Sequence, residues 1–255
     1  SKLNGVSPEA VFEAYGADTM RLFCLFAAPP EKDVEWNDEG VNGCYNFLRR
    51  MWRFFVTHQE RFEAIGDLKG EVDESLLSPE LVAYHRHVHR CIQKVSRDVE
   101  EEIQFNTAIA AMMELLNASK VLESLPAVEG GLPEDKAGLE GLRLLAFAGR
   151  SLSLMMAPFA PHFAEEVWRL VGDGGLACEH AWPEYDEAAT VEDVITIAVQ
   201  VNGKLRSQVD VARDASKEDM EAAARADETV QKWIADKTVR RVIAVPGRLV
   251  NIVVA

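Results

Sequence analysis

The chain has 255 residues, of which 48% are hydrophobic and 27% charged, and its formal net charge is −15. This length predicts one large domain and one small one, with enough apolar residues for a core. The sequence contains no run of roughly 18 uncharged apolar residues, which excludes a membrane-spanning helix. The acidic total argues against a protein that coats nucleic acid with its whole surface.

The charge is unevenly distributed along the chain. Residues 193–255 carry 10 Lys and Arg against 9 Asp and Glu, which leaves 17 and 33 for residues 1–192. The negative excess therefore belongs to the first part, and the second part is nearly neutral. Because the hydrophobic period also changes near residue 193, the sequence predicts a domain boundary there.

Cysteine and histidine spacing gives no clear metal signal. His85 and His89 are four residues apart, a spacing that a metal pair uses, but no third ligand is placed nearby. A hydrogen-bonded pair of buried histidines is the favoured interpretation. We interpret the cysteines as buried thiols in a reducing cytosol, because they show no CxxC spacing. They are Cys24, Cys44, Cys91 and Cys178.

Helix patterns dominate the first part of the chain. Ser7 and Pro8 are typical of a helix start, and a second helix is predicted over 17–27. A third is predicted over 38–63, where apolar residues recur with the helical period. The residues expected on its buried face are Val41, Cys44, Tyr45, Leu48, Met51, Trp52 and Phe55.

Later helices complete a predicted bundle. Two are expected over 79–103 and 107–117, with Ser78 and Asn106 as their N-caps. The apolar pattern over 142–171 is too wide for a surface helix. Its two prolines, Pro158 and Pro161, predict a kink or restart. We expect this bent helix to form the centre of the bundle.

From residue 194 onward the apolar period becomes two. Two strands are predicted over 194–201 and 204–211, joined by Asn202-Gly203, the pair typical of a two-residue hairpin turn. A helix over 216–236 and two more strands around a Pro-Gly turn follow. The expected module is a four-stranded sheet covered by one helix, in the order β-β-α-β-β.

Several motifs resemble class I leucyl-tRNA synthetases of the bacterial type. They are SKLNGVSPEAVFEAYGADTMRLF near the start, FLRRMW, FNTAIAAMMELLN, APFAPHFAEEVW, the NGK turn and VPGRLVNIVV at the end. By this resemblance the chain begins at the end of the KMSKS signature, and Ser1 and Lys2 are a remnant of the nucleotide loop. The resemblance implies a C-terminal fragment without the catalytic and editing domains.

The resemblance also implies a domain plan, with a mainly α fold and a small α+β domain at the end. A connecting segment covers 1–36, an anticodon-binding-type helical bundle covers 37–185, and a linker covers 186–192. A β-β-α-β-β domain that binds tRNA covers 193–255.

The activity implied for the parent is that of a leucine-tRNA ligase, which joins leucine to tRNA(Leu) through leucyl-adenylate, using ATP and Mg²⁺. This part is expected to bind and position the tRNA, next to the catalytic domain of the same chain. It is expected to have no catalytic residue, cofactor or metal of its own and to be inactive alone. A cytoplasmic monomer without a membrane partner is the implied state.

Basic side chains are the candidate tRNA contacts. Arg50 and Arg53 are three residues apart on the third helix, a spacing that can follow a phosphate backbone, and the resemblance favours Arg50. A solvated helix face explains the same pattern. Further candidates in the terminal module have an alternative role in protecting edge strands. They are Lys204, Arg206, Lys237, Arg240, Arg241 and Arg248.

Two other functions stay open. A helical bundle with a β module can serve as a protein-interaction scaffold with no role in RNA binding. The chain can also be the equivalent region of a valyl, isoleucyl or methionyl synthetase. Those relatives tend to end in a coiled coil, a zinc-bearing segment or an added oligonucleotide-binding barrel, and this sequence shows neither terminal heptads nor a CxxC pair.

Overall fold

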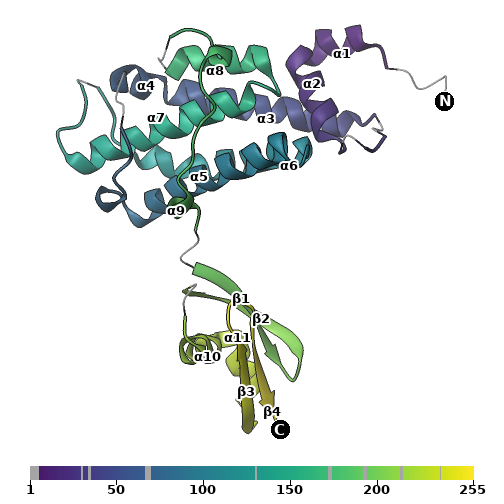
Figure 1. Ribbon diagram of the computed structural model, residues 1–255, viewed down its shortest axis with the longest axis vertical. Coiled ribbons are helices and arrows are strands. Elements are labelled where there is room, and N and C mark those ends of the chain that lie inside the picture. Colours follow the sequence, from purple (N-terminus) through teal and green to yellow (C-terminus); the bar gives the residue numbers. More distant parts are fainter. Residues whose placement is uncertain are drawn as a thin grey trace. The chain divides into compact units, whose positions relative to one another are not determined.

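The computed structural model describes residues 6–29, 31–33, 36–66, 70–129, 131–171, 174–191, 194–212, 215–235 and 237–255. The chain divides into two compact units, Ser1–Thr190 and Val191–Ala255 (Figure 1). Residues 187–190 of the expected linker form a short helix that belongs to the first unit. Within the described residues, no helix has the length and apolarity needed to cross a membrane.

The first unit is a bundle of helices around a single core, as predicted. Its 3₁₀ helices are η1 (Glu74–Leu76), η2 (Ser119–Ser124) and η3 (Ala177–Glu179). Its α-helices are α1 (Pro8–Tyr15), α2 (Ala17–Phe26), α3 (Asp38–Thr57), α4 (Gln59–Ile65), α5 (Pro79–Glu100), α6 (Phe105–Ala118), α7 (Lys136–Met156), α8 (Pro161–Val171) and α9 (Glu187–Thr190).

Side-chain caps fix several helix starts. Asn37 accepts hydrogen bonds from two amides at the start of α3, and Ser78 accepts one at the start of α5, as predicted. The prediction that Asn106 caps the next helix is wrong, because α6 begins two residues earlier than predicted, at Phe105, with Gln104 at the cap position. Ser7 precedes α1, but its hydroxyl bonds to Glu9 and caps no amide.

The third predicted helix is broken at His58. Here the backbone leaves the helical region, with φ −103° and ψ 7°, and α4 begins at the next residue. Arg61 contacts the buried ring of His58 at 2.8 Å (Nη1 to Nδ1) and donates to the carbonyls of Leu125 and Pro126. Arg61 thus connects the start of α4 to the loop after η2, a contact that the helical period could not predict.

Helix α7 forms the centre of the bundle (Figure 1). It packs against α4, α5 and α8, and most of its residues are buried. The kink expected at the two prolines is confirmed, because α7 ends at Met156 and α8 begins at Pro161. Gly149 lets the Phe62 ring approach closely, since a Cβ there would lie 2.8 Å from that ring.

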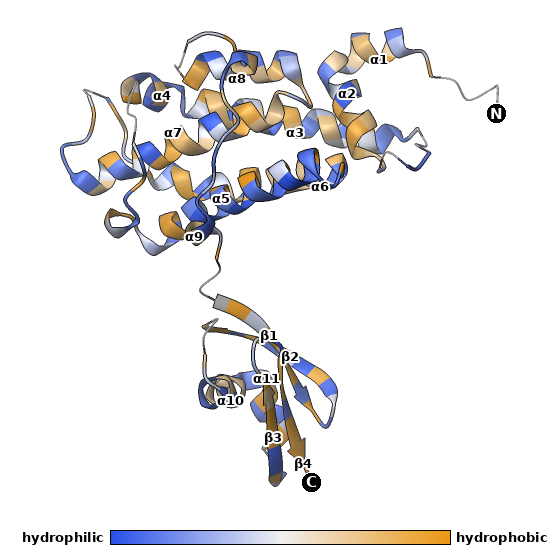
Figure 2. Ribbon diagram, in the orientation of Figure 1, coloured by the Kyte–Doolittle hydropathy of each residue, from blue (hydrophilic) through white to orange (hydrophobic). Residues whose placement is uncertain are grey.

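The second unit is a four-stranded sheet with helices on one face. Its order is β2-β1-β4-β3, in which β1 and β4 are parallel and the other pairs antiparallel. Asn202 (φ 52°) and Gly203 (φ 78°) form the predicted hairpin turn. Figure 2 shows that β4 is hydrophobic over most of its length. The strands are β1 (Val194–Val201), β2 (Lys204–Ala212), β3 (Val239–Val245) and β4 (Leu249–Val254).

The single covering helix predicted over 216–236 is in fact two helices, α10 (Lys217–Ala226) and α11 (Glu228–Ile234). Asp227 between them has ψ 125° and accepts a hydrogen bond from the amide of Val230 at 2.8 Å. An aspartate at a helix N-terminus competes with helix continuation in this way. The predicted Ser216 cap is present, and so is the reciprocal bond, in which the Ser216 backbone N–H donates to the Asp219 carboxylate.

Candidate nucleic-acid interface

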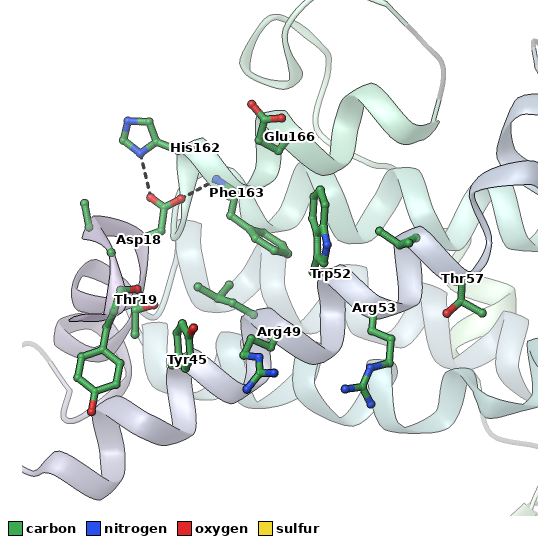
Figure 3. Close-up of a pocket in the computed structure, with 15 residues that line it drawn as sticks. Asp18, Thr19, Tyr45, Arg49, Trp52, Arg53, Thr57, His162, Phe163 and Glu166 are labelled. Carbon is green, nitrogen blue, oxygen red and sulfur yellow. Dashed lines mark hydrogen bonds and ion pairs between the residues drawn. The ribbon is translucent and has the colours of Figure 1, made fainter. Parts of the chain in front are cut away.

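A groove of about 840 Å³ opens along the outer side of α3, between α2 and α8 (Figure 3). Most of its surface is apolar, and Trp52 and Val56 leave 43% and 45% of their area exposed. The groove is lined by Tyr15, Gly16, Ala17, Asp18, Thr19, Tyr45, Leu48, Arg49, Trp52, Arg53, Val56, Thr57, His162, Phe163 and Glu166.

The helical period of α3 separates this groove from the core. Met51 and Phe55 are buried against the bundle, whereas Arg49, Trp52 and Arg53 face outward into the groove. Leu48 lies between the two sides, buried but at the floor of the groove. The prediction that Trp52 lies on the buried face is therefore wrong. It sits at the margin of the apolar stripe, where spacing alone cannot tell a buried from an exposed position.

Cations and aromatic rings alternate along the α3 side of the groove (Figure 3). The Arg49 guanidinium carbon lies 5.7 Å from the centre of the Tyr45 ring. Within the part of the chain that the structure describes, Arg53 has no hydrogen-bond or ion-pair partner. A phosphate can therefore approach these arginines without breaking an existing pair, and the rings offer stacking surfaces.

The opposite wall of the groove carries an acidic residue that is already engaged. Asp18 on α2 accepts hydrogen bonds from the backbone amide of Phe163 and from His162 Nδ1, the latter at 3.1 Å. These contacts fasten α2 to the start of α8 (Figure 3). The carboxylate is thus part of the scaffold that shapes the groove.

Arg50 points to the other side of α3. Its Nη1 donates to the Asn117 side chain on α6 at 2.7 Å, which fixes the direction of the guanidinium. Arg50, Arg53 and Lys120 line a smaller cleft of about 180 Å³ between α3 and η2. The structure thus brings the two predicted arginines together and adds Lys120 and Arg49. The sequence did not single out Lys120 because it is far from α3 in the chain, whereas the spacing of Arg49, four residues before Arg53, could have indicated it.

In the terminal unit, two of the six predicted basic residues meet at one ring. The Arg206 guanidinium carbon lies 3.5 Å from the centre of the Trp233 ring, and Lys237 Nζ lies 5.8 Å from it. Arg206 is the extra residue of a β-bulge in the β1–β2 pair, between Leu205 and Ser207, and its side chain reaches Trp233 of α11. Trp233 is still 39% exposed.

The other four predicted contact residues of this unit are exposed and spread over the sheet. Lys204 begins β2, whereas Arg240 and Arg241 lie on β3, the strand at the opposite edge. Arg248 sits after the Pro-Gly turn between β3 and β4. They therefore do not form one cluster. Ser1 and Lys2, the predicted nucleotide-loop remnant, lie outside the described residues.

The cysteines and histidines form no metal centre in the described part of the chain, where no group of three or more His, Cys, Asp or Glu is arranged to hold an ion. Burial raises the pKa of the Cys44 thiol to about 11 and that of Cys91 to about 12. Cys24 and Cys178 are exposed, so the expectation that all four thiols are buried is wrong.

Sequence comparison assigns the chain to a class of protein. The family described as the anticodon-binding domain of tRNA ligases matches residues 84–222, which is more than half of the chain. The chain therefore belongs to this family.

The chain is also similar in sequence to leucine-tRNA ligases. The chain is 46% identical to the leucine-tRNA ligase of Geobacter sp. (strain M21) over 100% of its length, and 46% identical to that of Azotobacter vinelandii (strain DJ) over 99%. It spans only 29% and 27% of those two proteins. A solved ternary complex of Agrobacterium radiobacter K84 agnB2 LeuRS, tRNA and LeuAMS matches 98% of this chain with a TM-score of 0.69 and 28% identity, over 30% of that structure.

Proposed function

We propose that this chain is the tRNA-binding C-terminal part of a leucyl-tRNA synthetase and that it positions tRNA(Leu) for the rest of the enzyme. The observation that carries the proposal is the row of guanidinium groups on the exposed side of α3, interleaved with aromatic rings. The structural similarity to a synthetase that was solved with tRNA supports it.

The proposed contacts are made to the RNA backbone. Arg50 and Arg53, with Arg49 beside them, contact phosphates from α3, while Trp52 offers a ring to an exposed base or sugar. In the terminal unit the proposed contacts are Lys204, Arg206, Lys237, Arg240, Arg241 and Arg248. Contacts of this kind need positive charge only where the RNA lies, which is compatible with the net charge of −15.

The activity of the whole protein is part of the proposal. The parent enzyme joins leucine to its tRNA through leucyl-adenylate with ATP and Mg²⁺, in the cytoplasm and as a monomer, and this part contacts the catalytic domain of the same chain. No described residue is assigned a catalytic role here. The chain alone is therefore expected to bind tRNA without forming leucyl-tRNA.

The test is binding of a tRNA(Leu) transcript at several salt concentrations. Replacing Arg49 and Arg53 by Ala is expected to weaken binding and to reduce the slope of log Kd against log salt by about 2, one for each phosphate contact. The control is Arg97→Ala on α5, which removes one exposed charge paired with Glu102 at 3.1 Å, so the effects of the two variants are compared per charge removed.

Three outcomes are informative. An effect confined to the α3 variant supports the proposed interface. Equal effects per charge removed would mean that only total charge matters and would contradict the contact assignment. If the unaltered chain does not bind tRNA at moderate salt, the RNA role fails and the protein-scaffold alternative gains support.

A further inference from the structure

Two buried histidines lie in contact on α5. His85 and His89 are 7% and 8% exposed, and their Nε2 atoms are 3.0 Å apart. The rings meet edge to face, at 88°, and the Phe147 ring of α7 covers them. Neither residue belongs to the proposed RNA interface, and a pair of polar rings is costly to bury unless each nitrogen has a partner.

The surrounding hydrogen bonds define which nitrogen carries each proton. The backbone N–H of Asp186 donates to His89 Nδ1 at 3.0 Å, so that nitrogen has no proton. Neutral His89 then carries its proton on Nε2 and donates it to His85 Nε2. His85 in turn donates from Nδ1 to Glu74 Oε1 at 2.9 Å. The result is a directional chain of bonds from the amide of residue 186 to a carboxylate on η1.

The carboxylate at the end of this chain is held in its charged form. Arg86 donates to Glu74 at 3.1 Å. Burial alone would raise the pKa of Glu74, but the hydrogen bonds from Arg86 and His85 outweigh burial and lower that pKa. A charged Glu74 accepts the hydrogen bond from His85 Nδ1, which preserves the direction of all the hydrogen bonds from Asp186 to Glu74.

This chain of bonds fastens a specific segment to α5. Asp186 directly precedes α9, and α9 packs on α5. A second bond lies nearby, from Trp182 Nε1 to the Ser96 hydroxyl at 2.8 Å. Residues 182–190 are the last of the first unit, after which the chain continues into the terminal unit. Both bonds hold the last residues of the helical unit against α5.

The anchor requires neutral His89. A proton on Nδ1 would turn the acceptor into a donor that faces another donor, and the bond from Asp186 would be lost. Burial, and after it the neighbouring His85, lowers the pKa of His89 to about 4, against the opposing effect of Asp186 and Glu74. The other groups around the pair are Glu71 and Glu184 in the adjoining cleft, Arg86 beside Glu74, and Arg143 of α7 near Gly70.

We propose that His85 and His89 are positioning residues, in which neutral His89 fastens residues 182–190 to α5 and protonated His89 releases them. The role is separate from RNA binding and holds whether or not the RNA proposal is correct. Acid release would free the end of the helical unit from which the terminal unit continues.

Hydrogen exchange measured by mass spectrometry on the whole chain tests this. His89→Asn places an amide oxygen where Nδ1 lies and cannot titrate, so it keeps the acceptor without the proton. At pH 7.5, His89→Ala is expected to lose protection in a peptide over 182–190, whereas His89→Asn keeps it. A peptide from α6, over 105–118, serves as the internal control.

The pH dependence separates a positioning role from simple packing. In the released state His89 is expected to titrate near pH 6.5, the usual value for histidine, and its protonation favours that state. Between pH 7.5 and 5.5 the protection of 182–190 is therefore expected to fall about tenfold in the unaltered chain, after correction for intrinsic exchange. His89→Asn is expected to show no such fall. If both proteins lose protection equally, or neither does, the proposal is overturned, and this comparison decides the question even if His89→Ala fails to fold.

Discussion

The guanidinium of Arg206 lies over the Trp233 ring, with its central carbon 3.5 Å from the ring centre. This contact joins the β1–β2 hairpin to α11 across the terminal unit. Arg206 Nε is buried without a hydrogen-bond partner in the described residues, so the ring face is the main contact of this end of the guanidinium. The pairing of a planar cation with an indole is stronger than that of a lysine ammonium.

Arg206→Lys should therefore weaken the terminal unit. Because charge is kept and stacking is lost, we expect destabilisation of about 0.5–1 kcal/mol. The measurement is hydrogen exchange in a peptide over 204–212, which should speed up several-fold. Arg240→Lys, on exposed β3, is the matched control. Identical exchange in both variants would show that the stacking contributes nothing.

The exposed arginines of β3 give a second prediction. Replacing Arg240 and Arg241 together by Ala should weaken tRNA(Leu) binding and flatten its salt dependence, because two phosphate contacts are lost. The measurement is the slope of log Kd against log salt. An unchanged affinity and slope would leave these residues only the role of protecting an edge strand.

Two glycines test how closely the bundle is packed. Gly149→Ala should destabilise the protein by about 1–3 kcal/mol, because its Cβ would lie 2.8 Å from the Phe62 ring. Gly43 is also inside a helix, α3, but nothing lies within 4 Å of its added Cβ. Gly43→Ala should instead stabilise by about 0.5–1 kcal/mol, because alanine favours the helix. Urea unfolding followed by circular dichroism measures both, and effects of the same sign would contradict this packing.

An ion pair with a buried carboxylate near the end of α5 predicts a large effect. Asp98 is fully buried, and its carboxylate accepts from Lys94 and from the Thr107 hydroxyl. Lys94→Met would leave this charge without its cation and should cost about 3–5 kcal/mol. Adding Asp98→Asn to that variant should recover part of the loss in unfolding experiments. No recovery would show that the cost arises from lost packing of the lysine stem.

His58 makes stability depend on pH. Burial, and then the nearby Arg61, lowers the pKa of His58 to about 4. The unfolded chain binds the proton near pH 6.5, so the stabilisation is complete above that pH and is lost as the pH falls from 6.5 toward 4. We expect a loss of about 2 kcal/mol after allowing for solvent screening. Urea unfolding of His58→Gln should show a shallower decline over this range, and parallel curves would contradict the assignment.

The sequence by itself determined the type and order of most elements, and with them the fold class. Apolar periods of 3.6 and 2 separated the helical bundle from the sheet, the two prolines located the kink before α8, and Asn202-Gly203 located the hairpin. These signals are local, because they depend on residues close together in the chain. For the same reason the motifs sufficed to indicate the synthetase family before any contact was known.

Only the tertiary structure decided which side chains meet. The exposure of Trp52, the breaks at His58 and Asp227, and the stacking of Arg206 on Trp233 all differ from, or go beyond, what spacing predicts. The bond from Asp186 to His89 joins positions 97 residues apart. Such partners are chosen by the packing of whole elements, where burial, shape and hydrogen-bond satisfaction act together, and a local pattern carries no record of that choice.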